Sequence, residues 1–328
     1  MIYLSTWYFS GMTVSDWIPE LVQDCSSAVG AVSIWSGSDL LSRGSTFAII
    51  PLDGDGFDRS SSSVLATNAH VVEGENVEVR VRFPGGLDVP ADVRLVDKAT
   101  DVAFLQVPVA CTRPFPLRMS DDVRLGESVI AIGNPHGFEC SVSAGIISGR
   151  DRILTGSGTG PGAVYANLLQ TDTPINGGNS GGPLIGRDGH VVGMNSISRT
   201  NTDGLHFAVP ADTVASHYEE LVTYGESSIK RASIGGRIAS YEFDPPAQHA
   251  LGLRSGARIE AVREESPMAA AGLQVGDVVI EFRELEVEHR HDLMMRLNRA
   301  AIGATCQLKY VREEQIHETQ ITPDPRND

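Results

Sequence analysis

The sequence is short of the features that mark nucleic-acid-binding and membrane proteins. Its 328 residues hold 26 Lys and Arg against 42 Asp and Glu, which gives a net charge of −16. Binding to a phosphate backbone needs clustered Lys and Arg, so we expect no nucleic-acid partner. Apolar runs such as 47–50 and 278–280 are the size of strands. A membrane helix needs roughly 20 apolar residues, so we expect no transmembrane segment.

Cysteine is also scarce, and the pattern indicates neither zinc nor a disulfide scaffold. The cysteines form no C-x-x-C pair, and they are Cys25, Cys111, Cys140 and Cys306. Buried free thiols are the expectation, with a single disulfide as the alternative. His289 and His291 form only a weak metal-binding pattern, and residues 53–56 lack the glutamate of a calcium loop. The sequence therefore predicts no metal and no cofactor.

The first residues carry no recognisable targeting signal. Met1–Gly11 has no Lys or Arg and lacks a long apolar middle, so it does not fit a signal peptide. Two explanations stay open, a cytoplasmic protein or a chain whose export segment is missing, so the localisation is unknown from the sequence.

Glycine is frequent, with 34 residues, and aromatic residues make up only 6%, which favours turn-rich β structure over a helical bundle. Residues 77–83 alternate between apolar and polar, 84–86 supply a turn, and 87–96 form a returning strand. Further short strands are predicted between 102 and 209. A helix is then predicted that ends near Gly225 and has four residues on one face: Val214, Tyr218, Leu221 and Val222. This pattern predicts a β-sandwich or a pair of barrels.

A smaller unit follows, with strands near 236–241, 258–263, 278–282 and 307–311 and a helix from about 291 to 300. The expected organisation is an N-terminal extension (1–13), a first domain (14–226), a linker (227–232), a second domain (233–323) and a C-terminal tail (324–328).

Three places carry residues suited to acyl transfer. His70 follows a strand, Asp101 opens an apolar strand, and Ser180 lies in the glycine-rich loop 177–183. A serine hydroxyl needs a base, a histidine titrates near neutrality, and a carboxylate orients the imidazole. Each residue alone also has an ordinary structural interpretation. Their order within one β-rich domain predicts a catalytic triad, with an oxyanion hole at Gly178, Asn179 and Ser180.

Longer motifs surround these residues, at 67–72, 100–105, 132–135, 143–149, 169–184 and 207–210. With them the chain resembles the HtrA/Deg family of serine proteases. Residues 265–279 resemble the PDZ core of the same family. The resemblance implies a mostly β fold: a trypsin-like double six-stranded β-barrel followed by a small α+β PDZ domain.

For function, the resemblance implies an ATP-independent serine endopeptidase that degrades unfolded or damaged proteins. Two alternatives stay open: a non-enzymatic chaperone or scaffold that holds unfolded chains, and a narrow regulatory protease activated by PDZ ligands.

The resemblance also locates two binding regions. Asn195, Ser196 and Ile197 form one wall of the specificity pocket, and His206, where the family usually has glycine, forms the other. No aspartate stands where a trypsin-like pocket needs one, so we expect small aliphatic residues before the cut. Peptides with free, apolar C-termini are expected to bind the PDZ domain along Ile234, Gly235, Gly236, Arg237 and Ile238.

Members of the family commonly form trimers through an aromatic residue before the first helix, and Trp17 falls at that position. The prediction is a homotrimer with Trp17 in the contact, and the alternative is a ring that covers its own domain's core. Gly177 stands where the family usually has proline, which predicts a more flexible oxyanion loop.

Overall fold

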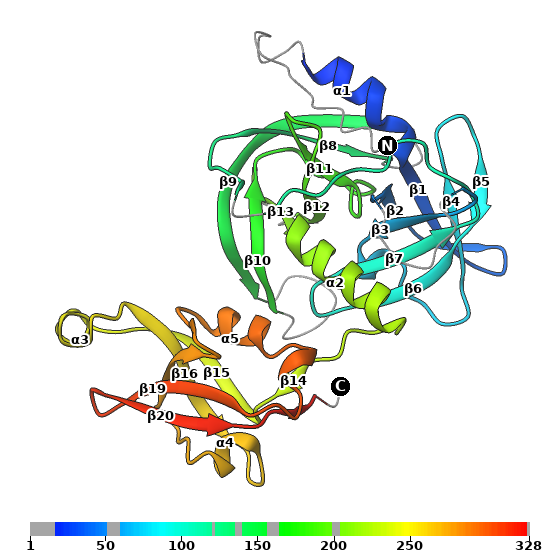
Figure 1. Ribbon diagram of the computed structural model, residues 1–328. Coiled ribbons are helices and arrows are strands. Elements are labelled where there is room, and N and C mark those ends of the chain that lie inside the picture. The colour runs from blue at the N-terminus through cyan, green and yellow to red at the C-terminus, as the bar shows by residue number, and fades with distance from the viewer. Residues whose placement is uncertain are drawn as a thin grey trace. The chain divides into compact units, whose positions relative to one another are not determined.

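The computed structural model describes residues 17–50, 60–119, 122–134, 140–155, 164–198 and 204–326. The chain divides into two compact units, Met1–Ile229 and Lys230–Asp328 (Figure 1).

The first unit begins with a seven-stranded antiparallel sheet in the order β5-β4-β1-β2-β3-β7-β6. Its strands are β1 (Val29–Ser36), β2 (Asp39–Ala48), β3 (Ser63–Thr67), β4 (Glu78–Arg82), β5 (Asp88–Pro90), β6 (Asp92–Asp97) and β7 (Val102–Val107). Only Ala91 separates β5 from β6 along the chain, so the sheet's two edge strands are joined covalently and the sheet curls on itself. A six-stranded barrel was expected here. Seven strands result because the returning strand changes partner: the N–H of Ala91 still donates to the carbonyl of Val79, next to β4, and Asp92 then pairs with Gln106 of β7.

The second half of this unit is a closed six-stranded barrel in the order β10-β13-β12-β11-β8-β9. Its strands are β8 (Ser128–Gly133), β9 (Ser141–Thr155), β10 (Val164–Thr171), β11 (Pro183–Gly186), β12 (Val191–Ser198) and β13 (His206–Pro210). Side chains that alternate along these strands fill its interior, among them Val129, Ala131, Leu169, Leu184 and Val192. The mostly β fold class is thus confirmed.

Two helices complete the first unit. In α1 (Trp17–Cys25) the buried residues Trp17, Leu21 and Cys25 recur every four residues, so they share one face. Helix α2 (Ala211–Tyr224) stops at Gly225, whose φ of 65° is the left-handed conformation that glycine adopts most easily. Short 3₁₀ turns are η1 (Ser26–Ala28) and η2 (Ala69–Val71). Across the described ranges, no helix combines the length and apolar character that a bilayer crossing requires.

The second unit is a sheet in the order β15-β16-β17-β19-β20, with β18 paired to β17. Its strands are β15 (Gly236–Glu242), β16 (Ser255–Val262), β17 (Val278–Phe282), β18 (Leu285–Glu286), β19 (Cys306–Arg312) and β20 (Gln315–Ile321). Its helices are α3 (Pro245–Leu251), α4 (Pro267–Ala270), α5 (Arg290–Arg296) and the 3₁₀ turn η5 (Arg299–Ala301). Leu293 of α5 is buried in the same cluster as Ile259, Val279 and Phe282 of the sheet.

The ends of this unit are tied together. Strand β14 (Ala232–Ser233) pairs with β21 (Asp324–Pro325), in register Ala232 with Pro325. Strand β14 spans the end of the predicted linker, at Ala232, and the first residue of the predicted second domain, Ser233, and β21 lies in the predicted tail. Residues that close a domain by pairing across more than 90 positions give no local signal, which is why neither segment was predicted as a strand.

All four cysteines are free thiols, buried at Cys25 and Cys306 and half-buried at Cys111 and Cys140. Burial raises the pKa of Cys25 to about 12, with smaller contributions from Cys140 and Asp24. A thiol with such a pKa is protonated near neutral pH and unreactive.

Candidate active site

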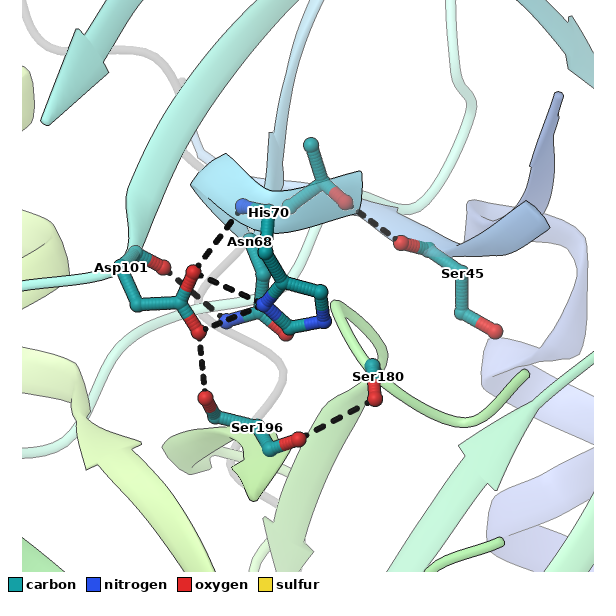
Figure 2. A network of polar contacts seen from close by, with 7 residues as sticks. Ser45, Asn68, His70, Asp101, Ser180 and Ser196 are labelled. Carbon is teal, nitrogen blue, oxygen red and sulfur yellow. Dashed lines mark hydrogen bonds and ion pairs between the residues drawn. The ribbon is translucent and has the colours of Figure 1, made fainter. Parts of the chain in front are cut away.

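The three residues predicted for acyl transfer come from both halves of the first unit. His70 lies in η2, directly after β3, and Asp101 directly precedes β7 of the same sheet. Ser180 lies in the loop before β11 of the closed barrel. Figure 2 shows that the folded chain gathers all three.

The carboxylate of Asp101 contacts both the ring and the backbone of His70. Nδ1 of His70 lies 2.9 Å from both carboxylate oxygens of Asp101, and the backbone N–H of His70 donates to Oδ1 at 3.1 Å. The side-chain amide of Asn68 donates to the carbonyl of Asp101 at 3.0 Å. Asp101 is 1% exposed, so its carboxylate makes these bonds away from water. The arrangement fixes the ring with Nε2 free to exchange a proton.

The electrostatics of His70 follow from this pair. Burial lowers the pKa of His70, but the hydrogen bond and charge of Asp101, aided by Glu73, outweigh burial and raise the pKa above 6.5. The carboxylate therefore stabilises the imidazolium, which is the form a general base reaches after taking a proton.

Ser180 lies on the other side of the imidazole. Its hydroxyl donates to the carbonyl of Ser196 at 3.1 Å, so its single proton points to β12 in this structure. In Figure 2 Ser180 lies toward the edge of the His70 ring that is remote from Asp101. A rotation about the Cα–Cβ bond of Ser180 is the movement that would turn its hydroxyl to the ring.

Ser196 contacts both ends of this arrangement. Its carbonyl accepts from Ser180, and its own hydroxyl donates to Oδ2 of Asp101 at 2.5 Å. The sequence placed Ser196 in the specificity pocket and gave no signal for the contact with Asp101. Asp101 and Ser196 belong to different halves of the unit, so only their packing reveals it.

Ser45 of β2 ties the loop of Ser180 to the rest of the unit. Its hydroxyl donates to the carbonyl of Gly178 at 2.6 Å and accepts from the N–H of Asn134 at 2.9 Å. Its backbone N–H donates to the carbonyl of Ser180 at 2.8 Å, and its carbonyl accepts from Thr67 at 2.7 Å. Part of this network is drawn in Figure 2. Ser45 is fully buried, whereas its partner Gly178 is half-buried.

The loop that was predicted to be an oxyanion hole offers two backbone donors. The N–H of Asn179 donates to the carbonyl of Asn176 at 3.0 Å and so is already used within the loop. The N–H groups of Gly178 and Ser180 have no acceptor among the described residues. Gly178 adopts a φ of 108°, a conformation that glycine reaches without strain.

The predicted pocket residues have differing surroundings. Asn195 is fully buried; its side-chain amide donates to Pro183 and its carbonyl accepts from Gly181. Ile197 lies in β12, and its side chain is outside the described part of the chain. His206 opens β13, opposite Thr171 of β10, and is half-buried. Burial lowers the pKa of His206, against a smaller opposing effect of the Asp172 charge.

The predicted peptide-binding segment lies at the edge of the second unit's sheet. Strand β15 carries Gly236, Arg237 and Ile238 and pairs only with β16 in this sheet. A Cβ at Gly236 would lie 2.3 Å from the carbonyl oxygen of Ala261 and 2.5 Å from the sulfur of Met268. Met268 therefore fills the space that an apolar side chain at position 236 would need. Ile234, just before the strand, is 2% exposed.

Trp17 is 1% exposed within its own chain and packs in the core of the first unit. That is the alternative that the sequence left open for this ring. A side chain so enclosed offers almost no surface to a neighbouring subunit. The aromatic residues 7–9 lie outside the described residues.

Comparisons with known proteins identify the two domains of the chain. A family model of the trypsin-like peptidase domain matches residues 52–194, and a PDZ domain model matches residues 240–322. The chain is 34% identical to the serine protease Do-like HtrA of Bacillus subtilis over 95% of its own length and 73% of that protein. It is 35% identical to a probable periplasmic serine endoprotease, DegP-like, of Halomonas elongata, over 82% of this chain but only 56% of that protein.

Among solved structures, an HtrA-type protease, AlgW, with a tripeptide superposes with a TM-score of 0.77 at 26% identity, covering 94% of this chain and 97% of that one. A trypsin-like peptidase model and a PDZ model thus match this chain in that order. This chain belongs to the HtrA family of serine proteases.

Proposed function

We propose that the protein is a serine endopeptidase that cleaves unfolded or damaged proteins without ATP, with Ser180 as nucleophile, His70 as base and acid, and Asp101 as orienting carboxylate. The observation that carries the proposal is the buried Asp101 carboxylate, 2.9 Å from Nδ1 of His70, with Ser180 beyond the ring.

The reaction would run in two halves. Nε2 of His70 takes the hydroxyl proton as Oγ of Ser180 bonds to the scissile carbonyl carbon, and the N–H groups of Gly178 and Ser180 donate to the oxyanion. The carbon–nitrogen bond then breaks, and His70 returns the proton to the leaving amine. His70 then takes a proton from a water molecule as its oxygen bonds to the acyl carbon, the bond from that carbon to Oγ of Ser180 breaks, and His70 returns the proton to Oγ.

Peptide capture would use the second unit. Strand β15 has a free edge in its sheet, so an extended peptide could add there as a further strand. Gly235, with a φ of 82°, would turn backbone N–H groups toward a terminal carboxylate. The AlgW structure with a bound tripeptide is in keeping with this use. Peptides with a free, apolar C-terminus should bind, and amidation of that terminus should abolish binding.

The direct test compares the full chain with a Ser180→Ala variant on casein and on short peptides. Broad cleavage by the parent and none by the variant supports the proposal. No cleavage by either favours a scaffold that only holds unfolded chains. Cleavage only after a C-terminal peptide is added favours a narrow regulatory protease. Equal cleavage by both proteins would refute the role of Ser180.

The homotrimer stays part of the proposal and rests on the resemblance to the family. Light scattering of the full chain gives its mass directly. Because the ring of Trp17 is buried in its own core, Trp17→Ala should first lower the melting temperature, and a trimer that survives it would show that other residues make the contact.

A further inference from the structure

A second histidine–aspartate pair lies in the first unit, apart from the site described above. Nε2 of His217, in α2, lies 2.9 Å from Oδ2 of Asp97 and 2.9 Å from the hydroxyl of Thr100, and this hydroxyl also donates to Oδ2 of Asp97. Nδ1 of His217 lies 3.3 Å from the hydroxyl of Ser216. Asp97 is 6% and His217 5% exposed. Buried groups of this kind need such partners, because an unpaired charge away from water is costly.

The position of this cluster ties it to Asp101. Asp97 is the last residue of β6, and the turn from Asp97 to Asp101 connects β6 to β7. Asp101 ends the turn with a φ of 60°, a left-handed conformation that residues other than glycine seldom adopt. Such a conformation persists only where surrounding contacts impose it. Asn68 contacts Asp101 at the end of the turn. His217 contacts Asp97 at its start and Thr100, the residue directly before Asp101.

Helix α2 is itself held in place against the hairpin formed by β6, this turn and β7. The ring of Tyr218 packs on Phe104 of β7 with centroids 5.5 Å apart. After the helix, the carbonyl of Ser227 accepts from the N–H of Val96, the neighbour of Asp97, at 3.0 Å. His217 is therefore presented to the turn from a helix with contacts to both of the strands that the turn joins.

We infer that His217 is a positioning residue for Asp101: through Asp97 and Thr100 it holds the turn that sets the carboxylate against Nδ1 of His70. The inference rests on the proposed catalytic role of Asp101. His217 itself has no contact with the reacting atoms in this scheme. A purely structural role would be different, because the pair would then stabilise the packing of α2 and leave the geometry of Asp101 unchanged.

The test uses the full chain with His217→Ala, His217→Gln and, as a control, Val214→Ala. Val214 is fully buried in α2, and its truncation loosens the same helix without removing a partner of Asp97. Each is made in the active protein, for kinetics on a peptide substrate, and in a Ser180→Ala background. There, NMR follows the titration of His70, assigned by its absence in a His70→Asn variant.

We expect His217→Ala to lower kcat about 10- to 100-fold with KM nearly unchanged, because small displacements of an orienting group have effects of this size. The pKa of His70 should fall, since the hydrogen bond and charge of Asp101 are what raise it. His217→Gln, which keeps an N–H donor, should recover most of both losses. Val214→Ala should lower the melting temperature and leave the pKa of His70 unchanged.

An unchanged titration of His70 in His217→Ala would overturn the inference, whatever happens to the melting temperature. So would a fall in kcat that Val214→Ala reproduces at equal stability. The titration is measured without turnover, so it tests the inference even if the protein cleaves no substrate. Absence of cleavage by the parent would count against the proposed function alone.

Discussion

The hydroxyl of Ser45 is the group whose removal best tests how the candidate site is held together. It is buried, and it donates to the carbonyl of Gly178 while accepting from the N–H of Asn134. Ser45→Ala deletes one oxygen atom and leaves these two groups without this partner. The main-chain bond from Ser45 to the carbonyl of Ser180 does not involve the side chain and should persist.

The expected loss of stability follows from those two groups. A buried polar group left unpaired costs about 1–3 kcal/mol, and the N–H of buried Asn134 should cost that amount. The carbonyl of Gly178 belongs to a half-buried residue that water can reach, so it should cost only about 1 kcal/mol. Together they should lower the free energy of unfolding by about 2–4 kcal/mol. In a domain of this size each kcal/mol shifts the melting temperature by about 2–4 °C. We therefore expect a melting temperature about 4–16 °C lower.

Activity should fall as well, because Ser45 fixes the carbonyl of the peptide group that joins Gly178 to Asn179. Released from Ser45, the loop would orient the N–H of Gly178 less well. Loss of one oxyanion donor costs about 10²–10³ in kcat, and partial disorder should cost about 10- to 100-fold.

The melting temperature is measured by calorimetry with Ser45→Ala placed in a Ser180→Ala background, because such proteins cannot digest themselves if the proposed function holds. The kcat is measured on a peptide substrate with Ser45→Ala in the active protein. Ser42→Ala, a half-buried serine of the same strand, is the matched control and should change stability by no more than about 0.5 kcal/mol. If Ser45→Ala has the same melting temperature as the Ser42→Ala control and the same kcat as the parent, the proposed role of this network is wrong.

Three further predictions follow from particular contacts. In the proposed mechanism neutral His70 is the base, and Asp101 raises the pKa of His70, so kcat/KM should rise with pH through that raised pKa. Asp101→Asn should move the rise to lower pH and reduce kcat by up to about 10⁴-fold, and a pH–rate profile with an unmoved midpoint would contradict this. Gly181→Ala should give a poorly folded or inactive protein, because its Cβ would lie 2.2 Å from the carbonyl oxygen of Ser45 and 2.3 Å from the hydroxyl of Thr67; normal melting and kcat would show that the loop yields easily. Arg312→Leu should destabilise the second unit by about 3–5 kcal/mol in denaturant unfolding, because it leaves the buried carboxylate of Asp277 without its charged partner. Both carboxylate oxygens lie 2.7 Å from the guanidinium, and a loss below about 1 kcal/mol would refute this.

Local patterns in the sequence predicted much of this molecule. Alternation over 77–83 matches β4, the apolar face around Val214 matches α2, and Gly225 ends that helix in the left-handed conformation. Such features depend on neighbours within a few residues, so periodicity and turn chemistry are enough to find them. The residue types of His70, Asp101 and Ser180 predicted a catalytic triad, and the resemblance of the motifs around them predicted the family.

Other features were decided by tertiary structure alone. One predicted strand is split at Ala91 because the chain changes partner there, and Trp17 is enclosed by its own core. Ser196 reaches Asp101 across 95 residues, Ser45 reaches Gly178 across 133, and His217 reaches Asp97 across 120. Serine and histidine are common on strands and helices, and nothing in their neighbours along the chain indicates these three contacts. Their partners are set by how the closed barrel and α2 pack on the first sheet, and that packing is a property of the whole fold.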